Sequence, residues 1–158
     1  MAELTHFDNN GNAHMVDISE KQISFRIAKA ACSVHMSLET LKIISDGSAK
    51  KGDVLSVARI AGIQGAKRTS ELIPLCHPIS LTKVNLDLIL NEKLPGIEII
   101  ATAKTNGPTG VEMEALTAAG ISALTVYDMV KSLDKSLIIK NLRLILKDGG
   151  KSGRYESS

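Results

Sequence analysis

The stretch TNGPTGVEMEALTAAGISALTVYDMVK, residues Thr105–Lys131, decides the fold of this 158-residue chain. Its Asn-Gly-Pro at 106–108 predicts a turn, and the carboxylates of Glu112 and Glu114 follow. Residues 115–127 contain no charge and no proline, so we expect one long helix over about residues 112–131. A helix that is apolar almost all round is usually buried. The charges near its end, Asp128 and Lys131, therefore need a reason, and catalysis is one.

The composition of the whole chain is that of a soluble globular protein, with 44% apolar and 23% charged residues. We expect one catalytic domain over residues 1–158. A net charge of +2 and the presence of two Phe, two Tyr and no Trp argue against a nucleic-acid surface. No uncharged stretch reaches the roughly 18 residues of a membrane span, and the N-terminus is unlike a signal peptide, so we expect a cytoplasmic protein that binds no membrane.

Alternating and helical patterns predict the remaining elements. Strands are expected over Lys21–Met36, Leu81–Leu90, Ile97–Lys104 and Leu137–Lys147, and helices after the caps Ser37 and Asp53, with a break in the second near Gly65. Residues 1–21 are expected to be an irregular arm with a short strand near Met15–Ile18, and residues 154–158 a frayed tail. This order predicts an α+β, ferredoxin-like sandwich, with a four-stranded antiparallel sheet and helices on one face.

Two loops could carry chemistry. Lys51 precedes Asp53, so it belongs either to an ordinary capped turn or to a site where Lys51 is an acid, a base or a phosphate ligand. Cys76 and His77 lie between two prolines that disfavour helix, and neighbours in an extended segment point to opposite faces. We expect His77 to point outward and Cys76 to be a small buried hydrophobe, and no zinc or other metal site is predicted.

Asp128 and Lys131 lie three residues apart, so they would touch on one helix face. This is either an ordinary ion pair or a pair that tunes the lysine, because the carboxylate favours the charged form and burial the neutral one. Glu112 lies sixteen residues from Asp128, roughly 24 Å along a helix with a rise of about 1.5 Å per residue. Either the two ends serve different purposes or a second subunit completes the site. We favour the second reading, which predicts an obligate homo-oligomer.

The stretch KDGGKSG at residues 147–153 ends like a phosphate loop but lacks the first glycine of that motif and a following helix. We therefore reject a P-loop, while Lys147 and Lys151 remain candidate phosphate contacts.

Several blocks of the chain, in the same order, resemble the cyclic pyranopterin monophosphate synthase family, the C proteins of molybdenum cofactor biosynthesis. The blocks are LTH from Leu4, MVDIS from Met15, KGDV from Lys51, ARIAGIQ from Ala58, AKRT from Ala66, LIPLCHP from Leu72, TGVEMEALT from Thr109, LTVYDMVK from Leu124 and GGKSG from Gly149. The resemblance implies a ferredoxin-like phosphorus-oxygen lyase. It implies conversion of 3′,8-cyclo-7,8-dihydroguanosine 5′-triphosphate to cyclic pyranopterin monophosphate with release of pyrophosphate. It also implies homohexamers, built as trimers of dimers, with sites at subunit interfaces.

The resemblance also implies roles for residues. The catalytic set would be Asp128 with Lys51 and Lys131 as acid/base partners. The substrate-binding candidates are Leu75, Cys76, His77, Glu112, Met113 and Glu114, with Lys67, Arg26, Lys147 and Lys151 for the triphosphate. No cofactor is required by the sequence, which leaves open whether magnesium accompanies the triphosphate.

Two other readings stand beside this one. The chain could be a ferredoxin-like module that binds a nucleotide or RNA without catalysis, although the weak charge and few aromatic residues count against RNA. It could also be a structural oligomer in which Lys51, Asp128 and Lys131 only form ion pairs. Replacing Lys51 or Asp128 with alanine separates the readings, since only a catalytic set would abolish product while assembly persists.

Overall fold

A computed structural model of the chain describes residues 5–157. The start of the predicted arm, including Leu4 of the first motif, and Ser158 of the predicted tail lie outside the described residues. The elements are β1 Ser24–His35, α1 Leu38–Ser45, α2 Val54–Lys67, α3 Thr69–Leu72, β2 Leu81–Asn91, β3 Gly96–Gly107, α4 Glu112–Val130, β4 Ile138–Asp148 and β5 Tyr155–Glu156.

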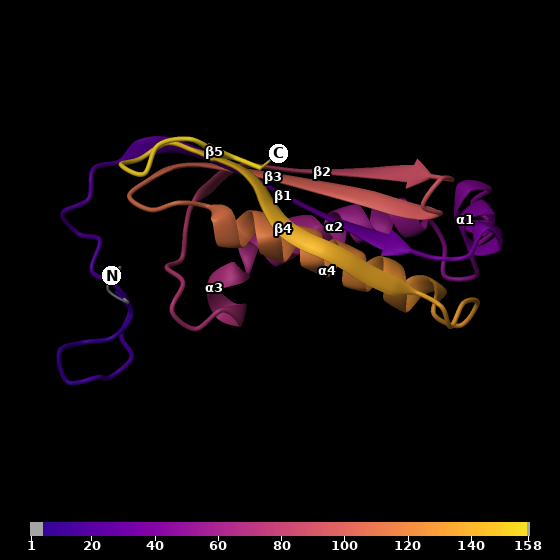
Figure 1. Cartoon of the computed structure of the whole chain (residues 1–158), viewed down its shortest axis with the longest axis horizontal. Coiled ribbons are helices and arrows are strands. Elements are labelled where there is room, and N and C mark those ends of the chain that lie inside the picture. The colour runs from indigo at the N-terminus through magenta and orange to yellow at the C-terminus, as the bar shows by residue number, and fades with distance from the viewer. Residues whose placement is uncertain (1–4, 158) are drawn as a thin grey trace.

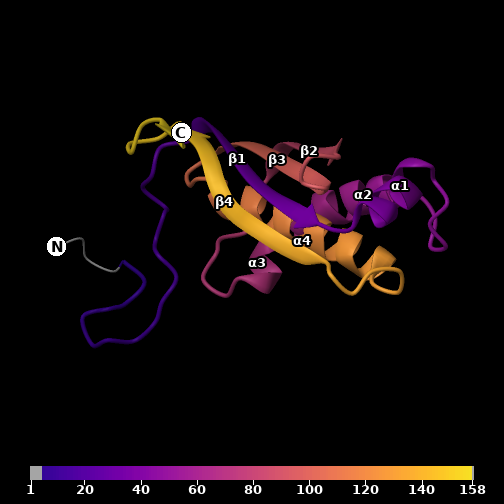
Figure 2. The same cartoon turned by 45° about the vertical axis from the view of Figure 1, so that its right-hand side comes forward.

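The sheet has the strand order β2-β3-β1-β4-β5, and every neighbouring pair is antiparallel. In Figures 1 and 2, α2, α3 and α4 lie on one side of this open sheet, and α1 lies beyond one end of the strands. The predicted α+β architecture with an antiparallel sheet is confirmed. Its first four strands have the ferredoxin-like order, and β5 makes a fifth strand that the sequence did not predict.

A layer of alanines joins α4 to the sheet. Its members have at most 1% of their surface exposed, and they are Ala28, Ala30, Ala101, Ala103, Ala115, Ala118, Ala119 and Ala123. Short side chains on both surfaces let the helix pack close to β1 and β3. On the outer side of α4, residues 5–157 leave Leu124 57% and Tyr127 37% exposed. The expectation that apolar residues bury this helix all round is therefore wrong for the single chain.

The predicted helix starts are confirmed. The Ser37 hydroxyl accepts a hydrogen bond from the Thr40 N–H, and the Asp53 carboxylate accepts one from the Ser56 N–H. The predicted break in the second helix occurs, but at Arg68 instead of at Gly65, where α2 ends and the short α3 begins. Gly65 serves helix packing instead, since a Cβ there would lie 2.9 Å from Cγ1 of Ile121 on α4.

Three further expectations need correction. The predicted turn at residues 106–108 begins later, since β3 continues to Gly107, which pairs with Ser24 of β1. No strand forms at Met15–Ile18, although an isolated bridge joins Phe7 to Ala13. The expected frayed tail instead turns back and pairs with β4 as β5, because Arg154 binds Asp148 and Glu156 across this turn.

Candidate active site

A cluster of three charged side chains lies at the C-terminal end of α4. The two carboxylate oxygens of Asp128 each bind one lysine, Oδ1 at 2.7 Å from Nζ of Lys131 and Oδ2 at 3.0 Å from Nζ of Lys51. Lys51 also donates to the backbone carbonyl of Asp128 at 3.0 Å. The turn before α2 delivers Lys51 to this helix end, where unpaired carbonyl groups favour a cation. The predicted contact between Asp128 and Lys131 is confirmed.

The electrostatics of this cluster favour charged side chains. Hydrogen bonds from Lys131 and then Lys51 lower the pKa of Asp128, and the hydrogen bond to Asp128 raises the pKa of Lys131. About half of each side chain is exposed, between 49% and 56%. Of the two opposing effects expected on Lys131, the carboxylate therefore prevails over burial within the single chain. In this state the lysines can donate protons and the aspartate can accept one.

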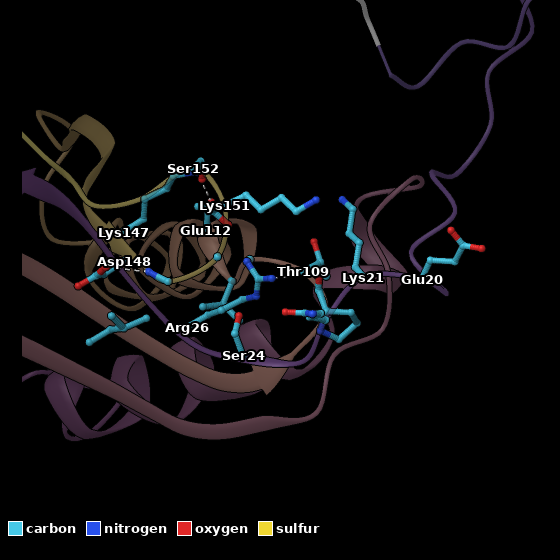
Figure 3. Close-up of a pocket in the computed structure, with 17 residues that line it drawn as sticks. Glu20, Lys21, Ser24, Arg26, Thr109, Glu112, Lys147, Asp148, Lys151 and Ser152 are labelled. Atoms are coloured by element: carbon cyan, nitrogen blue, oxygen red, sulfur yellow. Dashed lines mark hydrogen bonds and ion pairs between the residues drawn. The ribbon is translucent and has the colours of Figure 1, made fainter.

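A cleft of about 990 Å³ lies near the opposite end of α4. It brings together four of the predicted substrate-binding residues, Arg26, Glu112, Lys147 and Lys151 (Figure 3). Arg26 comes from β1, Glu112 from the first turn of α4, Lys147 from the end of β4 and Lys151 from the turn before β5. The walls therefore come from segments far apart in sequence, which the sheet places side by side.

Two side chains of this cleft are held by defined contacts. Arg26 donates from Nε to the Gly107 carbonyl at 2.9 Å and from Nη2 to the Pro108 carbonyl at 3.3 Å. Glu112 accepts a hydrogen bond from Nζ of Lys147 at 2.9 Å, and both side chains are about 30% exposed. The cleft is consequently rich in cations that partly buried contacts hold in place, as binding of an anion requires.

The sequence analysis missed other residues of this cleft. Lys21 lines it, and Figure 3 shows the Lys21 and Lys151 side chains extending toward each other. Ser24 also lines it, and within residues 5–157 its buried hydroxyl oxygen has no hydrogen-bond partner. Lys21 precedes β1 and Ser24 is the first residue of that strand, so a search for polar side chains near Arg26 could have found both.

Glu114 is a buried carboxylate in the first turn of α4. Only 3% of the residue is exposed, and its Oε2 finds no hydrogen-bond partner among the described residues. Burial, with a smaller contribution from the charge of Glu112, raises the pKa of Glu114 to about 7. Burial, followed by the Glu114 charge, also raises the pKa of the Cys76 thiol. Glu114 and the loop around Cys76 therefore share one environment.

The loop between α3 and β2 holds Leu75, Cys76 and His77, all of which are half-buried. Cys76 is a free thiol of intermediate exposure, so the expectation that it is fully buried is wrong. His77 lies with Nε2 2.6 Å from the Val16 carbonyl, so its proton on Nε2 is donated to the N-terminal arm. The loop lacks regular structure and packs only in part, which explains why neither side chain is fully outside or inside.

Lys67 and Met113 are not part of the 990 Å³ cleft. Lys67, the last residue of α2, lines a separate hollow of about 350 Å³ with Ile63 of α2, Ile79 of the following loop and residues 81–84 of β2. Met113 lies at the start of α4 and is 37% exposed. The candidates thus fall into the cluster around Asp128, the cation-rich cleft, the environment of Glu114, and Lys67 by itself.

No helix in residues 5–157 is both long and apolar enough to cross a membrane. Within the same residues, no group of three histidine, cysteine, aspartate or glutamate side chains is placed to hold a metal ion.

Fold and site together define a ferredoxin-like α+β protein with a cleft suited to an anionic small molecule. The chain belongs to the MoaC family, whose sequence pattern matches residues 15–150. It is 60% identical over 157 residues to the cyclic pyranopterin monophosphate synthase of Jannaschia sp. strain CCS1, covering 99% of this chain and 96% of that protein. Proteins of the same name from Cereibacter sphaeroides strain ATCC 17029 and Methylobacterium nodulans are 59% and 55% identical, with at least 98% of each chain covered.

Proposed function

We propose that the chain is a cyclic pyranopterin monophosphate synthase, a lyase that converts 3′,8-cyclo-7,8-dihydroguanosine 5′-triphosphate to cyclic pyranopterin monophosphate and releases pyrophosphate. The observation that carries this proposal is 60% identity to a protein of that name over almost the whole of both chains. The alternative of a binding module without catalysis has no comparable support, since the relatives reported above carry the name of an enzyme.

Proton transfer is assigned to Lys51, Asp128 and Lys131. Opening and rebuilding the guanine-derived ring requires groups that give and accept protons beside the reacting atoms. Asp128 holds both ammonium groups within 3.0 Å, which fixes two donors on one carboxylate. The aspartate positions the two lysines, and its hydrogen bond to Lys131 stabilises the charged form of that lysine.

Substrate binding is assigned to the other end of α4. Arg26, Lys147 and Lys151 would hold the triphosphate in the cleft that they line, with Lys67 as a further cation. Glu112 or Glu114 would accept hydrogen bonds from the guanine-derived N–H groups, and the segments Leu75–His77 and Met113–Glu114 would contribute backbone groups. Any magnesium would be carried by the triphosphate oxygens rather than by a separate protein site.

We further propose that each complete site is shared between two subunits of a homohexamer. Helix α4 is continuous from Glu112 to Val130, so its two charged ends are roughly 24 Å apart at about 1.5 Å per residue. That separation exceeds the reach of one small substrate. The exposed apolar side chains of Met113, Leu124 and Tyr127 lie along the same helix and support a subunit contact there.

Single replacements test the catalytic assignment. Lys51→Ala and Asp128→Ala are expected to lower kcat by about 10²–10⁴-fold while leaving assembly intact, because each removes a proton-transfer group. Lys50→Ala is the matched control, since Lys50 is an exposed neighbour outside the ion cluster. Full turnover of both variants would contradict the assignment, and loss of assembly instead would favour a structural role.

Mixing inactive chains that carry their defects at opposite ends of α4 tests the shared site. A Lys51→Ala chain and an Asp128→Ala chain contribute both defects to the same cluster, so the informative partner is an inactive Glu112→Ala chain. Hybrid oligomers of Glu112→Ala and Asp128→Ala should regain activity, because one interface would then combine two intact ends. No recovery in oligomers shown to be mixed would count against the sharing of the site.

A further inference from the structure

Two of the charged side chains in the cleft each lie against a glycine. The Arg26 guanidinium lies against Gly150 in the turn before β5, and a Cβ built on Gly150 would overlap Nη1 and lie 2.9 Å from Cζ. The Glu112 carboxylate lies against Gly110, where a Cβ would overlap Oε2 and lie 2.8 Å from Cδ. In both places a hydrogen atom occupies the space that any other residue type would fill with carbon.

We propose that Gly150 and Gly110 are positioning residues of this cleft, whose missing side chains seat the Arg26 guanidinium and the Glu112 carboxylate. The inference rests on the proposed function only in taking the cleft as the triphosphate site. Neither glycine touches the reacting atoms. Each acts through the charged group that lies against it.

Gly150 completes the surroundings of Arg26. Two carbonyl groups, of Gly107 and Pro108, accept hydrogen bonds from Nε and Nη2. Gly150 bounds the guanidinium beside Nη1 and Cζ, so the planar group is held between these contacts. A planar guanidinium binds phosphate oxygens through a fixed fork of N–H groups, and displacing it therefore weakens binding.

Gly110 leaves space for the Glu112 carboxylate, as Gly150 does for the Arg26 guanidinium. The backbone at Gly110 does not adopt a positive φ, so its conformation alone does not call for glycine. Its missing side chain makes room for the carboxylate, which then reaches Nζ of Lys147 at 2.9 Å. A methyl group at this position would push Glu112 away and separate it from Lys147.

Gly153 offers a matched control for Gly150. Gly150 has φ +78° and Gly153 has φ +68°, so alanine is strained at both, but a Cβ on Gly153 would meet nothing within 4 Å. The cost of backbone strain is present in both Gly150→Ala and Gly153→Ala, so it cancels when the two variants are compared. What remains is the displacement of Arg26.

The experiment measures binding of inorganic tripolyphosphate by calorimetry and the KM and kcat of the full-length protein for its cyclised nucleotide. Gly150→Ala should weaken tripolyphosphate binding and raise KM by about tenfold relative to Gly153→Ala, with a smaller change in kcat, because a charged hydrogen bond is worth about 1.5–3 kcal/mol. In an Arg26→Ala background, Gly150→Ala should have no further effect on binding.

A second cycle keeps the proposal open to refutation should Gly150→Ala fail to fold. Gly110→Ala should change tripolyphosphate binding in the parent chain but not in a Glu112→Ala background. Undiminished effects in the Arg26→Ala and Glu112→Ala backgrounds would overturn the proposal, as would equal binding by Gly150→Ala and Gly153→Ala. If the parent chain does not bind tripolyphosphate at all, the assignment of the cleft to the triphosphate fails. That result differs from equal binding by the glycine variants, so failure of the proposed function is told apart from failure of the role of the glycines.

Discussion

Replacing Glu114 with glutamine should make the protein more stable at neutral pH, and the gain should depend on pH. Glu114 is 3% exposed, its Oε2 has no hydrogen-bond partner among the described residues, and its pKa is raised from 4.5 to about 7. The folded state therefore holds a proton that the unfolded chain releases. This contribution to stability is fully present below pH 4.5 and is lost as the pH rises through 7. Glutamine has nearly the same shape but does not ionise.

The magnitude follows from the shift in pKa. A difference of about 2.5 pH units corresponds to at most about 3.4 kcal/mol, at 1.36 kcal/mol for each unit. Between pH 5 and pH 8, the stability of Glu114→Gln relative to the parent should increase by about 2–3 kcal/mol. The assay is urea unfolding of both proteins at pH 5, 6, 7 and 8, at one fixed protein concentration because assembly adds to apparent stability.

A control variant and a second measurement complete this test. Glu39→Gln, at an exposed position in the first turn of α1, controls for the loss of one negative charge. Infrared spectra at pH 6 should contain a protonated carboxyl band that Glu114→Gln removes. A stability difference that stays constant from pH 5 to pH 8, together with no such band, would refute the reasoning from burial.

The remaining predictions concern stability and are checked by urea unfolding. Asp53→Ala should lower the free energy of unfolding by about 1 kcal/mol, since the Ser56 N–H loses its cap, and Asp53→Asn should restore most of it. Gly65→Ala should lower it by about 1–3 kcal/mol through the clash with Ile121, and an added Ile121→Ala should recover part of the loss if the clash is the cause. Burial acts to raise the pKa of Asp134, but hydrogen bonds from Ser136 and the Ser37 N–H outweigh it and lower that pKa. Asp134 therefore stabilises the fold above its unfolded pKa of about 3.8, and this stabilisation is lost as the pH falls. In Asp134→Asn the free energy of unfolding should fall less steeply in acid than in the parent. The same fall in both proteins would contradict this.

Local patterns in the sequence were sufficient for most of the fold. Ser37 and Asp53 cap helices because their side chains satisfy N–H groups three residues away, which is a local property. Alternation along β2 and β3 likewise reflects the pleat of each strand. The break after α2 was placed three residues too early because Gly65 packs against Ile121 of another helix, and β5 was missed because its pairing depends on β4.

The candidate site was predictable to a different degree at each end of α4. The contact of Asp128 with Lys131 follows from helical spacing, whereas Lys51 is 77 residues away from Asp128 and was placed beside it by the family resemblance. The pair of Glu112 and Lys147 joins residues 35 apart and was not foreseen. Lys21 was overlooked because it lies at the very start of the predicted strand, and its place in the cleft depends on segments far away in sequence.

The alanine layer between α4 and the sheet restricts how the sequence can change over evolution. Each of its members is at most 1% exposed, so a larger residue at any one position has to push the helix away from β1 and β3. Glycine is the only smaller alternative, and within α4 it lowers helix propensity by about 1 kcal/mol. Single steps away from alanine are therefore penalised in both directions.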